Sequence, residues 1–252
     1  MRAGGDVDYD STGQGYATQR RPDPRIAAAI EAALGDAQTV VNVGAGAGSY
    51  EPAGRRLLAV EPSAVMRAQR PPGAAIAIHA YAEALPLDDG AVDAAMAVAT
   101  VHQWADRTKG LAELRRVARG PVVVLAFDGP ALGDWWLNDY APELIAAEQR
   151  RYPDISQTAA ALGSKVEVRV VPIPIDCTDG FTEAFYGRPE RLLDPAVRRA
   201  QSSWGFVGPE VEPRFVARLS DDLDSGRWDE RYGAWRRLPA YEGSVRLLVG
   251  WP

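Results

Sequence analysis

Short apolar runs alternate with amphipathic segments along the first half of the chain. Apolar runs bounded by glycine, proline or polar residues are typical of buried strands, and apolar residues spaced three and four apart are typical of helices. Helices are predicted over residues 23–34, where Gly35 stops the segment, and over residues 111–117. A short helix is also predicted after residue 60, which Ser63 can cap and Pro71-Pro72 ends. Strands are predicted at residues 39–43, 57–60, 75–79, 92–98 and 121–127. This alternation predicts a doubly wound, mainly parallel sheet with right-handed crossovers.

The pattern changes after Asp128. Aromatic residues open a predicted helix that continues to Arg151. Residues 166–175 alternate as a strand whose end is confined to an edge or a bulge by two prolines, and residues 244–249 form the seventh predicted strand. The segment between these two strands is rich in arginine, aromatic residues and proline. We expect it to be helical and to lie over one edge of the sheet.

Composition narrows the classes of function. The chain has 252 residues, a formal net charge of −6 and one cysteine, Cys177. The acidic balance disfavours a nucleic-acid partner, and a single cysteine excludes a disulfide framework or an iron–sulfur cluster held by this chain alone. No metal-ligand set is predicted. No apolar run has the length that a bilayer requires, and the acidic N-terminus is unlike a signal peptide, so we expect a cytoplasmic protein without membrane contact, as a monomer or homodimer.

A glycine loop and an acidic strand end carry the strongest chemical signal. The first predicted strand runs into Gly44, Gly46 and Gly48, and the second ends at Glu61. Glycine lets backbone amides approach a ligand closely, and a carboxylate at the end of the next parallel strand can accept hydrogen bonds from both hydroxyls of a ribose. The pair predicts a site for an adenosine-type cofactor.

The spacing of the glycines favours one cofactor. Dinucleotide enzymes prefer Gly-x-Gly-x-x-Gly, whereas this loop reads Gly-x-Gly-x-Gly. Together with Ala-Val-Glu-Pro-Ser, Ala-Glu-Ala-Leu-Pro-Leu, Val-Asp-Ala, His-Gln-Trp and Glu-Leu-Arg-Arg-Val in this order, the loop resembles class I S-adenosylmethionine (SAM)-dependent methyltransferases. The blocks are similar to the small-molecule branch related to ubiquinone and menaquinone methyltransferases (methyltransferase type 11). The resemblance covers roughly residues 9–128.

This resemblance implies a Rossmann-like, doubly wound, seven-stranded, mainly parallel sheet with helices on both faces and a C-terminal cap insertion. It implies a single domain over residues 1–252, with an N-terminal arm and lid helix at 1–35, a SAM-binding core at 36–128 and a substrate cap at about 176–243. The implied cofactor is SAM, with S-adenosylhomocysteine (SAH) as product, and the partner is a small-molecule methyl acceptor. The implied cofactor-binding residues are Tyr16, Arg20, Asn42, Gly44, Ala45, Gly46, Gly48, Glu61, Pro62, Met66, Ala82 and Glu83.

Several of these positions keep two interpretations. Tyr16 and Arg20 form either a lid over the cofactor or a surface ion pair, and Met66 packs either on the adenine or in the core. The family usually has an acidic residue where this chain has Asn42, and an aspartate where it has Tyr81. The amide oxygen of Asn42 still accepts hydrogen bonds, but the attraction between opposite charges is lost.

His102 is the candidate catalytic residue. It follows the fourth predicted strand, at the sheet edge where ligands bind in open α/β folds, and an imidazole pKa near 6.5 suits a general base. The alternative is a histidine that only holds a loop. Bulky aromatic residues are candidates for the wall of a substrate site, although each is also suited to packing in the cap. They are Trp135, Trp136, Phe185, Tyr186 and Trp204.

The leading prediction is methyl transfer to oxygen, nitrogen or carbon of a small organic molecule, plausibly a specialised metabolite. An NAD-dependent oxidoreductase on the same sheet is disfavoured by the glycine spacing. A non-methylating SAM-binding protein, or an enzyme that uses SAM to assist a pericyclic or cyclase reaction, remains an alternative. A nucleic-acid methyltransferase is disfavoured, because the fourth strand lacks an Asn/Asp-Pro-Pro-aromatic ending.

Overall fold

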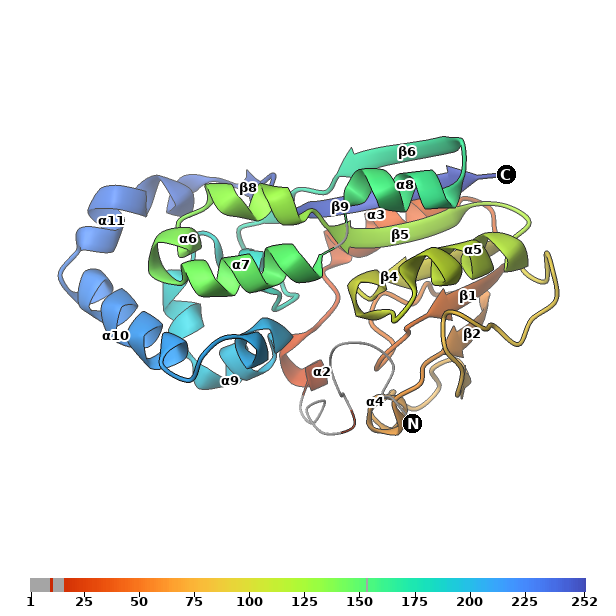
Figure 1. Cartoon of the computed structure of the whole chain (residues 1–252), viewed down its shortest axis with the longest axis horizontal. Helices are drawn as coiled ribbons and strands as arrows, with labels where there is room; N and C mark the ends of the chain where they lie inside the picture. Colours follow the sequence, from red (N-terminus) through yellow and green to blue (C-terminus); the bar gives the residue numbers. More distant parts are fainter. Residues whose placement is uncertain (1–9, 11–15, 153) are drawn as a thin grey trace.

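A seven-stranded sheet forms the centre of the protein (Figure 1). The computed structural model describes residues 10, 16–152 and 154–252. The strand order is β3-β2-β1-β4-β5-β9-β6, parallel from β3 to β5, with β9 antiparallel to both of its neighbours. This confirms the predicted Rossmann-like, mainly parallel sheet. The strands are β1 (Thr39–Val43), β2 (Arg56–Val60), β3 (Ala77–Ile78), β4 (Ala94–Val98), β5 (Val122–Phe127), β6 (Lys165–Val170) and β9 (Val245–Trp251).

Both faces of the central strands are buried. Val40 and Met96 belong to one apolar cluster, while their neighbours Val41 and Ala95 belong to a second cluster on the opposite face. Burial on both faces explains why these strands read as continuous apolar runs instead of alternating ones. One cluster includes apolar residues of α3, and the other includes those of α5 and α8. The bounds of these helices are Pro24–Leu34 for α3, Arg107–Val117 for α5 and Ile155–Leu162 for α8.

Side-chain caps fix the helices next to the glycine loop. Asp23 caps α3 by accepting a hydrogen bond from the backbone of Arg25, and Ser63 caps α4 (Ala64–Ala68) by accepting one from Met66. The Ser63 cap confirms the sequence prediction. It places the start of α4 directly after the end of β2.

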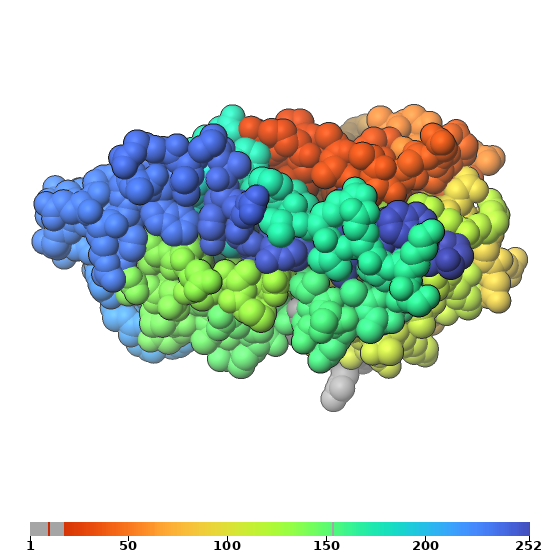
Figure 2. All heavy atoms as spheres, turned by 90° about the horizontal axis from the view of Figure 1, so that it is seen from above, coloured from red at the N-terminus to blue at the C-terminus, as the bar shows by residue number. Residues whose placement is uncertain are grey.

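A cap lies beside the sheet, and it comprises the predicted cap at about 176–243 together with residues 129–151, which pack against it. The blue helices α10 and α11 lie at one end of the elongated molecule (Figures 1 and 2), and α9 lies between α10 and α2. The short strands β7 (Ile173–Pro174) and β8 (Ala240–Tyr241) pair as a separate antiparallel ribbon. The remaining elements are α2 (Tyr16–Gln19), η1 (Val101–Gln103), η2 (Gly129–Asp134), α6 (Leu137–Tyr140), α7 (Pro142–Arg151), η3 (Thr182–Phe185), η4 (Pro189–Leu193), α9 (Pro195–Arg199), η5 (Ser202–Phe206), α10 (Val211–Asp224), α11 (Arg227–Tyr232) and η6 (Gly233–Arg237).

An aromatic cluster holds the cap together. Trp136 is buried, packs edge-on against Trp228 with ring centroids 5.4 Å apart, and donates from Nε1 to the backbone oxygen of Tyr186 at 2.7 Å. Tyr140 and Tyr232 complete the cluster. Such edge-to-face contacts add to the stabilisation that burial provides. These tryptophans therefore have a packing role in the cap.

The prediction of one unbroken helix up to Arg151 is wrong. It is split into α6 and α7 at Ala141, whose backbone angles of −142° and 62° are not helical. The physical reason is Pro142, because a proline ring disfavours helical geometry at the preceding residue and starts a new helix well at its own position. Separately, no helix in the described ranges combines the length and apolar character needed to cross a membrane.

Candidate active site

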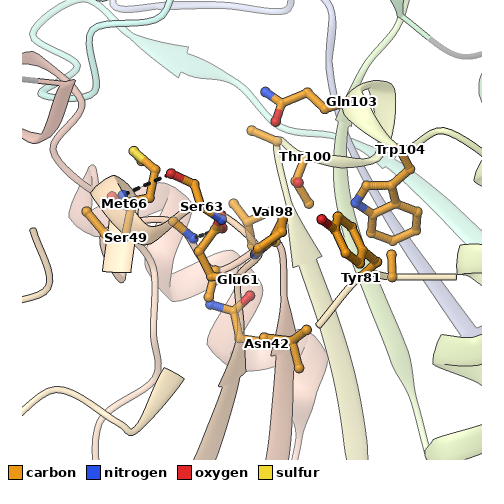
Figure 3. A pocket seen from close by; sticks show the side chains of 18 of the residues that line it. Asn42, Ser49, Glu61, Ser63, Met66, Tyr81, Val98, Thr100, Gln103 and Trp104 are labelled. Atoms are coloured by element: carbon orange, nitrogen blue, oxygen red, sulfur yellow. Dashed lines mark hydrogen bonds between the residues drawn. The ribbon is translucent and has the colours of Figure 1, made fainter. Parts of the chain in front are cut away.

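A deep pocket opens at the carboxyl ends of β1, β2 and β4 (Figure 3). This is the edge at which open α/β sheets bind ligands. Its empty volume is about 1290 Å³, including the open mouth. Ten of the predicted cofactor residues line it, namely Arg20, Asn42, Gly44, Ala45, Gly46, Glu61, Pro62, Met66, Ala82 and Glu83. Gly48 closes the turn behind the lining by donating from its backbone to the oxygen of Ala45 at 2.9 Å.

The glycine loop has a backbone shape that favours glycine. Gly44 has φ of 71°, and a Cβ placed there would lie 2.1 Å from Oγ1 of Thr100. Gly46 and Gly48 also have positive φ, at 53° and 94°. A residue with a side chain would therefore be strained, and at Gly44 it would also collide with the end of β4. The loop keeps its backbone open to the pocket.

Glu61 is fixed to this loop. Its Oε2 accepts a hydrogen bond of 2.8 Å from the backbone of Gly46, and its Oε1 accepts one of 2.8 Å from the backbone of Ser63. Burial raises the pKa of Glu61, while these two backbone bonds oppose the shift. Each carboxylate oxygen keeps a free lone pair for a ligand hydroxyl. Figure 3 shows Glu61 between Asn42 and Ser63.

Asn42 provides an acceptor without a partner. Its Nδ2 donates to Glu51 at 3.2 Å, and Glu51 is held in turn by Arg70 at 2.7 Å. The buried Oδ1 of Asn42 has no hydrogen-bond partner among the described residues. A buried unpaired carbonyl oxygen is costly, and an ammonium group would satisfy it. The residue therefore fits the amino-acid end of the predicted cofactor.

The opposite side of the pocket is formed by residues 80–83 and 103–105, where Tyr81 and Trp104 lie in Figure 3. Oε1 of Glu83 accepts a hydrogen bond of 3.0 Å from the backbone of Asp106, so this side chain holds the loop between β4 and α5. The sequence did not single out Gln103 or Trp104 for the cofactor. The two residues follow His102 in the His-Gln-Trp block, and this block could have indicated that they lie at the site.

The N-terminal segment reaches the same pocket. Nε of Arg20 pairs with Asp179 of the cap at 2.6 Å, and Asp179 also accepts 3.0 Å from the hydroxyl of Tyr50. Asp10 accepts 2.6 Å from the hydroxyl of Ser63. The backbone of Tyr16 lies in α2, but its side chain is outside the described part of the chain. Arg20 therefore lines the pocket while it joins the N-terminal segment to the cap.

His102 lines a second, smaller cavity beside the first. It has an empty volume of about 360 Å³, and it shares Arg20, Ala99 and Gln103 with the cofactor pocket. Burial first, and then the positive charges of nearby arginines, lower the pKa of His102 to about 3. The imidazole is therefore neutral near pH 7, but its basicity is far below the value that suits a general base. A catalytic role for His102 stays a prediction.

The predicted aromatic wall is made by other residues. Trp135, Trp136, Phe185, Tyr186 and Trp204 pack within the cap and are not among the residues that line either cavity. Phe127, Tyr152 and Phe181 line the second cavity instead. Phe127 ends β5 and lies in an apolar run, so nothing sets it apart from core residues in the sequence. Tyr152 follows α7 and Phe181 precedes η3, and each is a single aromatic residue outside any pattern that points to a site.

The fold, the glycine loop and the acidic strand end define a SAM-binding methyltransferase site. A family model described as a methyltransferase domain matches residues 41–124. A putative methyltransferase of an antibiotic biosynthesis pathway from Anabaena variabilis is 30% identical, with a TM-score of 0.86, over 93% of this chain and 99% of that one. The chain therefore belongs to the class I SAM-dependent methyltransferases, and its cofactor is SAM.

More distant structures share the fold. A possible histamine N-methyltransferase from Thermotoga maritima is 16% identical, with a TM-score of 0.57, over 96% of this chain and 97% of that one. A geranyl diphosphate C-methyltransferase from Streptomyces coelicolor is 15% identical, with a TM-score of 0.51, over 90% of this chain and 75% of that one. No curated protein matches the chain. The relation to ubiquinone and menaquinone methyltransferases remains a resemblance.

Proposed function

We propose that this methyltransferase acts on a small organic molecule, plausibly a specialised metabolite, at oxygen, nitrogen or carbon. The carrying observation is that the cofactor pocket and the second cavity share Arg20, Ala99 and Gln103. A cavity that adjoins the cofactor site and is walled by the cap suits a small acceptor better than a polymer. The relative from an antibiotic biosynthesis pathway supports the same class of acceptor.

Some residues are assigned to cofactor binding, and others to enclosing the acceptor. When bound, SAM supplies a methyl group that is already activated by its sulfonium. We assign Glu61 to the ribose hydroxyls and Oδ1 of Asn42 to the ammonium group of the cofactor. The remaining task is to position the acceptor and exclude water, which accounts for much of the rate enhancement in such transfers. We assign that task to the cap at about 176–243, with residues 1–35 as the arm and lid.

Calorimetry with SAH tests the cofactor site, and methyl transfer to a metabolite panel tests the acceptor class. We expect micromolar SAH binding and transfer of a labelled methyl group from SAM to at least one small molecule. Glu61→Ala should weaken SAH binding by about tenfold or more and reduce methyl transfer, whereas Glu167→Ala on the exposed strand β6 should change neither. SAH binding without transfer to any acceptor would favour the non-methylating alternative, and absence of SAH binding would refute the proposal.

A further inference from the structure

The second cavity has features of a site built for a ligand of limited size. It lies between the sheet edge and the cap, and His102, Phe127, Glu148 and Gln201 contribute to its lining. Its empty volume of about 360 Å³ compares with about 1290 Å³ for the cofactor pocket, both including open space. The second cavity is therefore much the smaller of the two, and a ligand held there has to be smaller than the cofactor. This cavity is called the acceptor pocket below.

Aromatic rings form one continuous wall of the acceptor pocket. Phe127 and Tyr152 stack with centroids 5.0 Å apart, and Phe181 tilts against Phe127 at 5.6 Å. The imidazole of His102 meets Tyr152 edge-on at 5.2 Å. A flat ligand ring gains the same stacked or edge-on contacts against such a wall.

One polar group on the lining lacks a partner. Gln201 is 5% exposed, its Oε1 accepts 3.1 Å from the indole of Trp204, and its Nε2 has no hydrogen-bond partner within the described ranges. An orphaned buried amide donor costs free energy that a ligand oxygen would recover. The side chain therefore points to a ligand with a hydrogen-bond acceptor.

The charges on the lining are already balanced. Glu148 is 1% exposed and accepts from the hydroxyls of Thr182 at 2.9 Å and Ser203 at 2.7 Å. Arg151 donates to the same Ser203 hydroxyl at 3.3 Å, so its positive charge faces Glu148 across one hydroxyl. Arg20 is paired with Asp179. A charged ligand would add a buried charge without a counter-ion, which is costly, so the lining favours a neutral ligand.

From this geometry we propose that the acceptor pocket binds a neutral, single-ring methyl acceptor that carries an oxygen toward Nε2 of Gln201. The ring packs on Phe127, Tyr152 and Phe181. The hydroxyl or amino group that receives the methyl group is a second substituent, directed to the side shared with the cofactor pocket. This inference rests on the proposed function, because it assigns the substrate class of the same site.

The test uses matched neutral and charged rings on the SAH-saturated protein at pH 7. The probes are 3- and 4-hydroxybenzamide, which carry a carbonyl oxygen, phenol, which lacks it, and 4-hydroxybenzoate, which is anionic. We expect calorimetry to show at least one hydroxybenzamide binding about tenfold more tightly than phenol and 4-hydroxybenzoate, the gain of one satisfied buried donor.

Variants then test whether Gln201 is responsible for the tighter binding of hydroxybenzamide. Gln201→Leu should reduce hydroxybenzamide binding to the level of phenol while leaving SAH affinity unchanged. Gln201→Glu keeps an oxygen for the indole of Trp204 but removes the amide donor. It should therefore also reduce hydroxybenzamide binding to the level of phenol, and it serves as the test if the leucine variant folds poorly. Gln157→Leu on the exposed side of α8 is the matched control and should change nothing.

The outcomes separate the two proposals. Equal binding of all probes, no binding of any, or a hydroxybenzamide preference that survives both Gln201 variants would overturn this inference while SAH still binds. Loss of SAH binding by the unmodified protein would overturn the proposed function together with it. Tighter binding of 4-hydroxybenzoate than of the amides would show a site for anions instead.

Discussion

The backbone N–H of Gly46 donates a hydrogen bond of 2.8 Å to Oε2 of Glu61. This bond joins the glycine loop after β1 to the acidic end of β2, so the two halves of the cofactor signature form one unit before any ligand arrives. A preorganised carboxylate loses less free energy on binding than one that must be ordered by the ligand. The geometry of this pair underlies the first prediction.

Replacing Glu61 should disable cofactor binding. Glu61→Ala removes the acceptor that we propose for the ribose hydroxyls and also the bond to Gly46, and hydrogen bonds to a charged group contribute about 1.5–3 kcal/mol each. We expect the Kd of SAH, measured by calorimetry, to rise by about tenfold or more. Glu167→Ala is the control because Glu167 lies on the exposed strand β6. A change of less than about threefold in Glu61→Ala would contradict the assigned role.

The collision at Gly44 can be separated from backbone strain. Gly44 and Gly54 have nearly equal positive φ, 71° and 75°, but a Cβ at Gly54 meets nothing within 4 Å. Alanine at either site should cost about 1–2 kcal/mol for the left-handed backbone. Gly44→Ala should cost clearly more in urea unfolding and should also weaken SAH binding, because its Cβ strikes Thr100. Adding Thr100→Ala to Gly44→Ala should recover part of the loss, and equal costs at the two glycines would refute the collision.

The ion pair between Arg20 and Asp179 should stabilise the contact between the N-terminal segment and the cap. Asp179 is 4% exposed, so Arg20→Ala leaves a buried carboxylate that has lost this counter-ion, while the hydroxyl of Tyr50 still donates to it. Breaking such a pair costs about 3–5 kcal/mol, to be measured by urea unfolding. Arg169→Ala removes an exposed pair with Glu167 and should cost less than about 1 kcal/mol. Similar costs for the two variants would show that burial of Asp179 is unimportant.

Glu183 should make stability depend on pH. Burial raises its pKa to about 7, although the hydroxyl and backbone of Ser244 donate hydrogen bonds to it. Because the pKa is higher in the folded state than in the unfolded chain, near 4.5, its contribution is fully present below pH 4.5 and is lost as pH rises to 7. A shift of this size corresponds to a loss of about 3–4 kcal/mol.

Glu183→Gln should remove that dependence. The stability of the variant relative to the unmodified protein, measured by urea unfolding at several pH values, should rise between pH 5 and pH 8. Glu242→Gln, at an exposed position, should show no such trend. A relative stability that stays constant over this range would mean that Glu183 is ionised throughout.

The sequence predicted the elements that depend on local chemistry. Strand β1 matches its prediction, and Ser63 caps α4 as expected, because both depend on residues within a few positions of each other. The split at Ala141 was missed although Pro142 gave a local signal for it. The separation of β7 from β6 into its own ribbon depends on pairing with β8, far along the chain, and no local pattern contains that information.

The site divides in the same way. The cofactor half is encoded by consecutive strand ends, since parallel neighbouring strands place Gly44, Gly46 and Glu61 at one edge whatever the rest of the chain does. The sequence by itself therefore determined the fold class and the cofactor. Only the tertiary structure decided the acceptor pocket, because Phe127, Glu148 and Gln201 come from separate segments that long-range packing brings together. It also decided the low pKa of His102, which depends on burial and on arginines from other elements and not on the residues beside it in the chain.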